Sequence, residues 1–268
     1  MAFPQVQQET TLMCISNEVP GGLMSNAVWQ GVPLATLLEA AGPQARVVEV
    51  LLHAADGYTD TIPFAKALDP TTLLVYAMNG EPLPDRHGYP ARLLVPGLYG
   101  EKSVKWITRV ELVNQDVKGF YERQGWGPNF TIRPRARIDQ PVGDLVIAAG
   151  STSVPIKGVA FGGNRGVARV DVSLDDGQSW QLATLDSATS PLAWVFWSYA
   201  WSAPGPDTYI IVARATDGDG LLQTATVHGT APEGATGYHR IMVQVRYTFD
   251  GHKLRICHAE PERSISRS

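Results

Sequence analysis

Cys14 carries the side chain with the most distinctive chemistry, in an apolar run that leads into a segment rich in glycine, serine and asparagine. A thiolate acts as a nucleophile when a histidine nearby serves as its base, or as a ligand for a soft metal. The other cysteine, Cys257, lies near the opposite end of the chain, so the sequence contains neither a disulfide framework nor a cysteine-rich zinc site. A buried, inert thiol is the usual fate of a lone cysteine, and all three roles stay open at this point.

The segment from Leu74 to Trp106 holds the greatest density of residues suited to binding. His87 and Arg92 flank a Gly-Tyr-Pro turn, and the residues that follow combine glycines, a serine and two lysines. Flexible backbone N–H groups with lysine and arginine nearby can cradle a phosphate. The segment is not a P-loop, because Glu101 interrupts the Gly-Lys-Ser order. An anion site and an ordinary turn with solvated charges fit this spacing equally well.

The sequence Ser-Leu-Asp-Asp-Gly-Gln-Ser-Trp at 173–180 has the form of a hairpin turn that recurs in sialidase propellers. It occurs once here, so we interpret it as a folding device in which Asp and Ser oxygens satisfy turn amides beneath a packed tryptophan. Asp217-Gly-Asp-Gly lacks the remaining ligands of a calcium loop and is also interpreted as a turn.

Short elements must position these residues, since 26 glycines and 19 prolines break the chain into pieces. The spacing of leucines and alanines predicts a helix over Pro33–Ala41, and a second, short helix is expected over Phe64–Leu68. Asn79-Gly80 between apolar flanks predicts a tight turn. The predicted strands of this part are Arg46–Leu52, Thr72–Met78, Ala91–Val95 and Lys105–Val113. This first part is therefore expected to mix helix and strand.

Residues 114–143 change in character, and we interpret them as a linker over the surface, although the arginines at 133, 135 and 137 could also bind an anion. From Asp144 onward, apolar and polar residues alternate between regular turn signals. About seven such strands over ~100 residues indicate an immunoglobulin-like sandwich.

The composition excludes several classes of protein. A hydrophobic content of 44% and a charged content of 18% in 268 residues indicate a globular protein of one large or two ordinary domains. The formal net charge of -4 provides no basic field that would favour nucleic acid. No apolar run approaches the ~20 residues needed to cross a bilayer, and the first ten residues lack the form of a secretory signal. We expect a soluble, mildly acidic, two-domain protein.

Taken together, these residues resemble the sulfite oxidase family of molybdenum-cofactor oxidoreductases. The most specific part is Ala-Met-Asn-Gly-Glu-Pro-Leu-Pro-Asp-Arg-His-Gly-Tyr-Pro-Ala-Arg at 77–92, continuing through Val95-Pro-Gly and Val104-Lys-Trp. The run at 169–180 resembles the dimerisation domain of that family. The resemblance implies an α+β protein: a mixed α/β molybdopterin-binding domain over 1–137, N-terminally incomplete, an immunoglobulin-like dimerisation sandwich over 138–248, and a loose tail over 249–268.

The resemblance also implies a role for individual residues. Cys14 corresponds to the cysteine whose thiolate binds molybdenum, with the other sulfurs supplied by the pterin dithiolene. Tyr58 corresponds to the tyrosine that faces the substrate pocket, and Arg240 is assigned to the sandwich-domain arginine that reaches toward it. Arg92 is suited to the phosphate of the cofactor. The implied cofactor-binding positions are Asp56, His87, Arg92, Ser103, Val104 and Lys105.

The activity implied is two-electron oxygen-atom transfer at a molybdenum-molybdopterin cofactor, on a small oxyanion or a sulfoxide-like substrate. A separate electron-transfer partner is expected, since no haem or flavin motif is present, together with a homodimer formed through the sandwich. Sulfite-oxidising members follow their cysteine with Ala-Gly-Asn-Arg, whereas Cys-Ile-Ser-Asn-Glu at 14–18 places a carboxylate, Glu18, where a cation would be expected. A negative charge there disfavours a dianion such as sulfite.

Two alternatives to an active enzyme follow from the sequence. The family's cofactor domain begins well before its cysteine, whereas 13 residues precede Cys14, so part of the pocket is expected to be missing. A truncated, non-catalytic member acting in assembly or interaction is therefore the first alternative. A glycan-binding sandwich rests on Trp194, Trp197 and Trp201, although tryptophans at this spacing more often form a core. The compartment stays open: cytoplasmic as written, or periplasmic or membrane-associated if a missing N-terminal segment carries an export signal or anchor.

Overall fold

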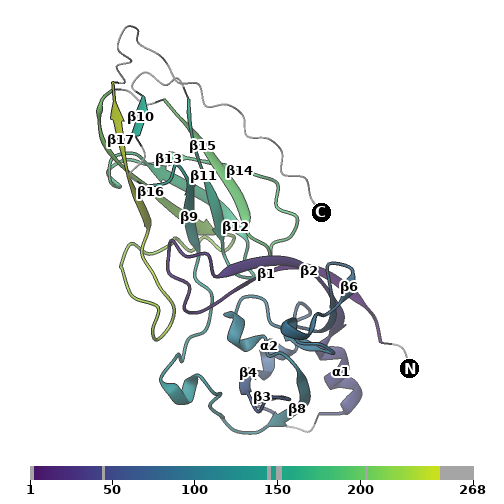
Figure 1. Cartoon of the computed structure of the whole chain (residues 1–268). Helices are drawn as coiled ribbons and strands as arrows, with labels where there is room; N and C mark the ends of the chain where they lie inside the picture. The colour runs from purple at the N-terminus through teal and green to yellow at the C-terminus, as the bar shows by residue number, and fades with distance from the viewer. Residues whose placement is uncertain (1–2, 44–45, 144–145, 149–152, 203–204, 248–268) are drawn as a thin grey trace.

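The computed structural model describes residues 3–43, 46–143, 146–148, 153–202 and 205–247. These residues form a mixed, β-rich fold in two parts that lie side by side, with β1 to β8 in one part and β9 to β17 in the other (Figure 1). The predicted tail at 249–268 lies outside the described residues. No helix of the described part is both long and apolar enough to cross a membrane.

The first part contains a five-stranded antiparallel sheet with the β1–β2 hairpin at one edge. β2 pairs with β1 on one side and with β5 on the other, and β5 also pairs with β6 and β7. The strands are β1 (Val6–Met13), β2 (Met24–Pro33), β5 (Leu73–Met78), β6 (Glu81–Pro82) and β7 (Arg92–Leu94). The loop between β1 and β2 begins with Cys14.

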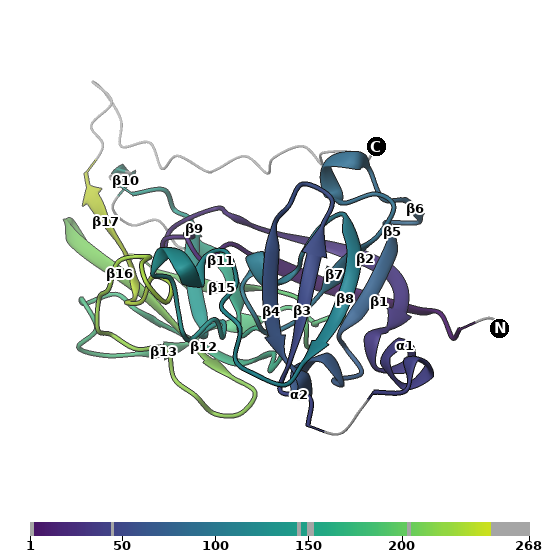
Figure 2. The ribbon, with the colours of Figure 1, turned by 90° about the horizontal axis from the view of Figure 1, so that it is seen from below.

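A second, three-stranded antiparallel sheet lies beside it, with its strands next to one another in Figure 2. Its strands are β4 (Thr59–Pro63), β3 (Glu49–Ala54) and β8 (Ile107–Val113). A hydrophobic core that includes Leu38, Val50, Ile62 and Leu93 joins residues of both sheets to α1 (Leu34–Ala41). Three short 3-10 helices complete this part: η1 (Asp85–His87), η2 (Gly100–Lys102) and η3 (Glu122–Gln124).

Local sequence signals account for the helices and the tight turn of this part. Helix α1 buries Leu34 and Leu38 on its apolar face, and Gly42 ends it with φ of 68°. A glycine is favoured there because a left-handed backbone costs other residues free energy. Helix α2 (Phe64–Ala67) confirms the second predicted helix. Asn79 and Gly80 both have positive φ, 54° and 85°, as the predicted turn between β5 and β6 requires.

The second part consists of two sheets that pack face to face over a shared core. One sheet has the order β14 (Thr184–Leu185), β15 (Val195–Trp201), β11 (Val154–Phe161) and β9 (Arg135–Gln140). The other has the order β10 (Val146–Ala148), β17 (His239–Arg246), β16 (Asp207–Asp217), β12 (Val167–Ser173) and β13 (Gln181–Leu182). Trp197 and Trp201 are 1% and 3% exposed within this core, which favours a packing role over a sugar-binding one.

The turn at 173–180 has the hydrogen bonds that its sequence predicts. The hydroxyl of Ser173 donates to Oδ1 of Asp175 at 2.7 Å, and the hydroxyl of Ser179 donates to Oδ2 at 2.6 Å. The amide of Gly177 donates to the Ser173 hydroxyl at 2.7 Å. These contacts lower the pKa of Asp175 to about 2, chiefly through its bonds from Ser179. The motif is therefore a folding device in this chain.

The interpretation of residues 114–143 as a surface linker is wrong for its last third, because residues 135–140 form β9 and pair with β11. Arg135 is 5% exposed and donates to the carbonyls of Asn17, Glu18 and Ala235, so it connects three separate segments. Arg133 pairs with Glu233, and the guanidinium of Arg137 pairs with Asp139. The predicted domain division between 137 and 138 falls within β9 and stays a prediction.

Candidate active site

A cavity of about 840 Å³ lies where the β1–β2 loop, the β3–β4 turn and the segment around η2 meet. Its wall comes from segments far apart in the sequence, which only the tertiary fold brings together. Seven of the nine predicted site residues line it, namely Cys14, Asp56, Tyr58, Arg92, Ser103, Val104 and Lys105. His87 and Arg240 do not.

Cys14 directly follows β1, and its side chain is exposed at the cavity wall. Its backbone N–H donates to the carbonyl of Leu23 at 3.0 Å, which fixes the cysteine at the start of the loop. Its Sγ lies 3.0 Å from the hydroxyl of Ser16. The interpretation as a buried, inert thiol is therefore wrong, because the sulfur is accessible from the cavity.

Arg92, at the start of β7, provides a buried positive charge in the cavity wall. Its guanidinium donates to the carbonyls of His87 at 3.1 Å and Ser103 at 2.9 Å. No carboxylate forms an ion pair with it among the residues that the structure describes. Burial lowers the pKa of Arg92 to about 10, which still leaves it cationic at neutral pH. The site thus contains a cation whose charge the described side chains leave unbalanced.

Positive charge accumulates around this arginine. The pKa of Lys105 is lowered mainly by burial and to a smaller extent by the charge of Arg92. The ammonium of Lys105 donates to the carbonyl of Arg86 at 3.0 Å. Burial and then the cations Arg86, Arg92 and Lys105 lower the pKa of His87, which favours its neutral imidazole. His87 lies behind the cavity wall and contacts the site through its carbonyl. These charges repel one another unless an anion lies among them.

Gly88 allows this close arrangement. A Cβ atom at position 88 would lie 3.0 Å from Cβ of Arg92 and 3.1 Å from Cβ of Lys105, and the residue has φ of 111°. Only glycine fits such a backbone without strain.

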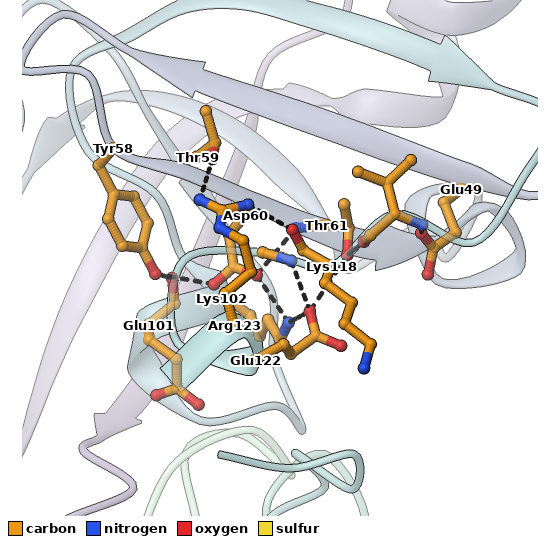
Figure 3. A network of polar contacts seen from close by, with 12 residues as sticks. Glu49, Tyr58, Thr59, Asp60, Thr61, Glu101, Lys102, Lys118, Glu122 and Arg123 are labelled. Carbon is orange, nitrogen blue, oxygen red and sulfur yellow. Dashed lines mark hydrogen bonds and ion pairs between the residues drawn. The ribbon is translucent and has the colours of Figure 1, made fainter. Parts of the chain in front are cut away.

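Tyr58 is held by a buried polar network (Figure 3). Its hydroxyl donates to Oδ2 of Asp60 at 2.8 Å, and Nζ of Lys102 lies 2.7 Å from Oδ1 of the same carboxylate. Nζ of Lys102 also lies 3.2 Å from Oε2 of Glu122. Burial and then Asp60 raise the pKa of Tyr58, so its hydroxyl keeps its proton at all physiological pH values. Tyr58 therefore lines the cavity as a fixed, neutral side chain whose hydroxyl proton is directed to Asp60.

Arg240 lies elsewhere in the structure. It is an exposed residue of β17, and its guanidinium pairs with Asp176 in the turn after β12. The described chain does not bring Arg240 to the cavity, because β17 directs it toward an acidic partner of its own part.

Comparison with known proteins assigns the family. A family model described as the oxidoreductase molybdopterin binding domain matches residues 1–121, and another, the Mo-co oxidoreductase dimerisation domain, matches residues 134–246. The mitochondrial sulfite oxidase of Rattus norvegicus is 34% identical over 296 residues, which cover 91% of this chain and 53% of the relative. The chain belongs to the sulfite oxidase family of molybdopterin oxidoreductases. It spans about half the length of the mammalian sulfite oxidases that it matches.

The chain is also similar to a nitrate reductase and to a solved structure. Inducible nitrate reductase [NADH] 2 of Glycine max is 30% identical over 256 residues, covering 73% of this chain and 29% of the relative. The structure of the sulfane dehydrogenase SoxCD from Paracoccus pantotrophus superposes with a TM-score of 0.77 at 25% identity, covering 90% of this chain and 70% of that one. The fold and the family assignment therefore agree.

The residues of the cavity fit the cofactor for which the sulfite oxidase family domain is named. Among the described residues, no group of three or more His, Cys, Asp or Glu side chains could hold a metal ion. A metal at Cys14 would therefore take its other ligands from a bound group, as a dithiolene provides. The unbalanced charge of Arg92, beside Lys105, suits a phosphate at the other end of such a group.

Two findings at this site were not predicted from the sequence. Glu101, which the sequence presents only as an interruption of a phosphate-loop pattern, lines the cavity. Glu18, the carboxylate expected near the substrate, is exposed and is not among the lining residues. No spacing or composition distinguishes these two glutamates, because their positions depend on tertiary contacts.

Proposed function

We propose that this chain is a molybdenum-cofactor-dependent oxidoreductase of sulfite oxidase type, which catalyses two-electron oxygen-atom transfer on a small oxyanion or a sulfoxide-like substrate. The observation that carries this proposal is the meeting, in one cavity, of the exposed thiol of Cys14 and the buried guanidinium of Arg92. When bound, the molybdenum cofactor supplies a two-electron centre that accepts or donates an oxygen atom.

The chain's own residues bind and orient that group. Cys14 provides a single thiol, which needs to lose its proton before it can bind a metal as a thiolate. Arg92 and Lys105 would hold the phosphate, and the backbone of Ser103 and Val104 would hold the pterin. The amide of Leu93 donates to the carbonyl of Val104 at 2.8 Å, which keeps this loop in place.

Asp56 and Tyr58 shape the other side of the cavity. Oδ1 of Asp56 accepts the amide of Tyr58 at 3.0 Å, so the two residues form one turn between β3 and β4. Tyr58 would line the substrate side of the cavity with a side chain that Asp60 and Lys102 hold in place. Arg240 is not part of this proposal, because its guanidinium is engaged by Asp176.

The two parts of the fold divide these tasks. We assign the first to an α+β cofactor domain and the second to an immunoglobulin-like sandwich through which two copies form a homodimer. The match to a dimerisation domain over residues 134–246 supports this division. Electrons pass to or from a separate partner protein.

Metal and cofactor analysis of the purified protein tests the function. Expressed in a host that makes the cofactor, the protein should contain close to one molybdenum per chain, measured by mass spectrometry of the metal, with an equal amount of pterin measured by fluorescence after oxidation. Protein that folds but contains neither would refute the proposal and favour a non-catalytic role in assembly.

A further inference from the structure

Glu101 is an unpartnered carboxylate at the wall of the cavity. Both of its carboxylate oxygens are buried and have no hydrogen-bond partner among the described residues, although the residue lines the cavity together with Cys14 and Tyr58. Buried carboxylates in folded proteins are almost always paired or hydrogen-bonded, because removing an unpaired charge from water is costly. The missing partner of Glu101 therefore points to a ligand of this cavity.

The cations that adjoin Glu101 in sequence or line the same cavity are engaged elsewhere. The ammonium of Lys102 contacts Asp60 and Glu122, at 2.7 Å and 3.2 Å. The guanidinium of Arg92 donates to backbone carbonyls, and the ammonium of Lys105 lies 4.1 Å from the ring centre of Trp106. None of these cations pairs with Glu101.

The backbone of Glu101 lies against Tyr58. The hydroxyl of Tyr58 approaches the carbonyl of Glu101 at 3.4 Å, which ties η2 to the β3–β4 turn. Figure 3 shows the carboxylate of Glu101 pointing away from the network of Asp60, Lys102 and Glu122. The side chain is thus kept apart from the charges that would neutralise it.

Its charge depends on burial and on its neighbours. Burial, and to a smaller extent the carboxylate of Asp60, raise the pKa of Glu101 to about 7, while the residue's own backbone amide and the charge of Lys102 oppose that shift. Near neutral pH the ionised form repels an anion in the cavity, and the protonated form donates a hydrogen bond to an oxygen atom.

We propose that Glu101 is a specificity-determining residue that makes the cavity favour uncharged oxygen-carrying substrates, such as sulfoxides, over dianions such as sulfite. This inference rests on the proposed function, because it concerns the substrate of the same site. A sulfoxide brings no negative charge toward the carboxylate, and its oxygen accepts a hydrogen bond from the protonated carboxyl group. A dianion meets repulsion from the ionised carboxylate, which opposes its attraction to the cations of the cavity.

Charge removal at position 101 tests this assignment. Glu101→Gln keeps the shape of the side chain and removes its charge, and Glu18→Gln makes the same change at an exposed position outside the cavity. The affinities of the purified holoenzyme for sulfate and for dimethyl sulfoxide are measured by calorimetry at pH 8. We expect E101Q to bind sulfate at least tenfold more tightly than the wild type, with dimethyl sulfoxide changed by less than threefold and E18Q unchanged for both.

Two results would overturn the assignment: a sulfate affinity in E101Q within twofold of the wild type, or an equal gain in E18Q. Glu101→Ala is the second variant, and it also removes the charge if the glutamine variant does not fold. Molybdenum content reports separately on the proposed function. Protein without molybdenum would refute that function, whereas the sulfate comparison on the same sample still shows whether Glu101 repels a dianion.

Discussion

Nζ of Lys102 lies 2.7 Å from Oδ1 of Asp60, and both side chains are almost completely buried, with 4% and 1% of their surface exposed. The same carboxylate accepts the hydroxyl of Tyr58 through its other oxygen. One buried ion pair thus fixes a tyrosine of the cavity, so its removal should change both stability and the site.

We expect Lys102→Met to lower the free energy of unfolding by about 3–5 kcal/mol, because Asp60 then stays buried without its cation. Urea denaturation measures the change. Lys66→Met is the matched control: its ammonium lies 2.7 Å from Asp69 in a more exposed pair on α2. Its loss should cost about 1 kcal/mol or less. Equal effects of the two substitutions would contradict a special role for the buried pair.

Cys14→Ser should abolish turnover and reduce the molybdenum content while leaving the melting temperature nearly unchanged. The exchange replaces one sulfur by one oxygen on an exposed side chain, so the packing of the fold is not affected. A hydroxyl is a much poorer ligand than a thiolate for a soft metal. Cys257→Ser is the control for loss of a thiol elsewhere. Normal activity in the Cys14 variant would rule out the ligand role.

Arg92→Ala should lower the amount of pterin that co-purifies with the protein by at least tenfold, because the phosphate loses a bidentate partner. Arg92→Lys keeps the positive charge but loses the planar guanidinium. Its pterin content should therefore lie between that of the wild type and that of Arg92→Ala. Arg109→Ala removes an arginine that is 60% exposed and pairs with Glu111, and should leave cofactor content unchanged. If the Arg92 and Arg109 variants retain equal amounts of pterin, Arg92 does not bind the phosphate.

Local patterns in the sequence predict the helices and turns of this chain, but not β9. Leu34 and Leu38 at helical spacing, followed by Gly42, are sufficient to define α1. Strand β9 begins with Arg135, and the sequence does not signal that this arginine is buried, because the carbonyls that satisfy it come from distant segments. The burial of Arg135 depends on contacts between the two parts of the fold, so no local pattern predicts it.

The site shows the same limit. The resemblance to a family was enough to name residues that the fold gathers in one cavity, such as Cys14 and Arg92. The same resemblance predicts Arg240 at that cavity. In the structure, Arg240 instead pairs with Asp176 in the second part of the fold. The sequence does not predict that the carboxylate of Glu101 is buried at the cavity, because this burial arises from contacts between distant segments rather than from neighbouring residues.

Trp197→Ala should destabilise the second part by about 3–5 kcal/mol, because a large buried side chain leaves a cavity behind. Trp197 is 1% exposed, whereas its neighbour Phe196 on the other face of β15 is 54% exposed. Phe196→Ala should therefore change the free energy of unfolding by about 0.5 kcal/mol or less. Urea denaturation of both variants compares the two faces. A milder effect at 197 than at 196 would contradict the assignment of this tryptophan to the core.

The raised pKa of Glu101 predicts how stability changes with pH. The folded state binds the proton of this carboxyl more tightly than the unfolded chain does, since the pKa rises from 4.5 to about 7 on folding. Its stabilising effect is fully present below pH 4.5 and is lost as the pH rises through about 7. At 1.36 kcal/mol per pKa unit, the loss amounts to about 3 kcal/mol at most.

Glu101→Gln should remove this decline, so that the variant unfolds at higher urea concentration than the wild type at pH 8 but not at pH 4.5. Glu18→Gln, at an exposed position, should follow the wild type at both pH values. Parallel stability curves for the wild type and E101Q would show that the Glu101 carboxyl keeps its ordinary pKa in the folded protein.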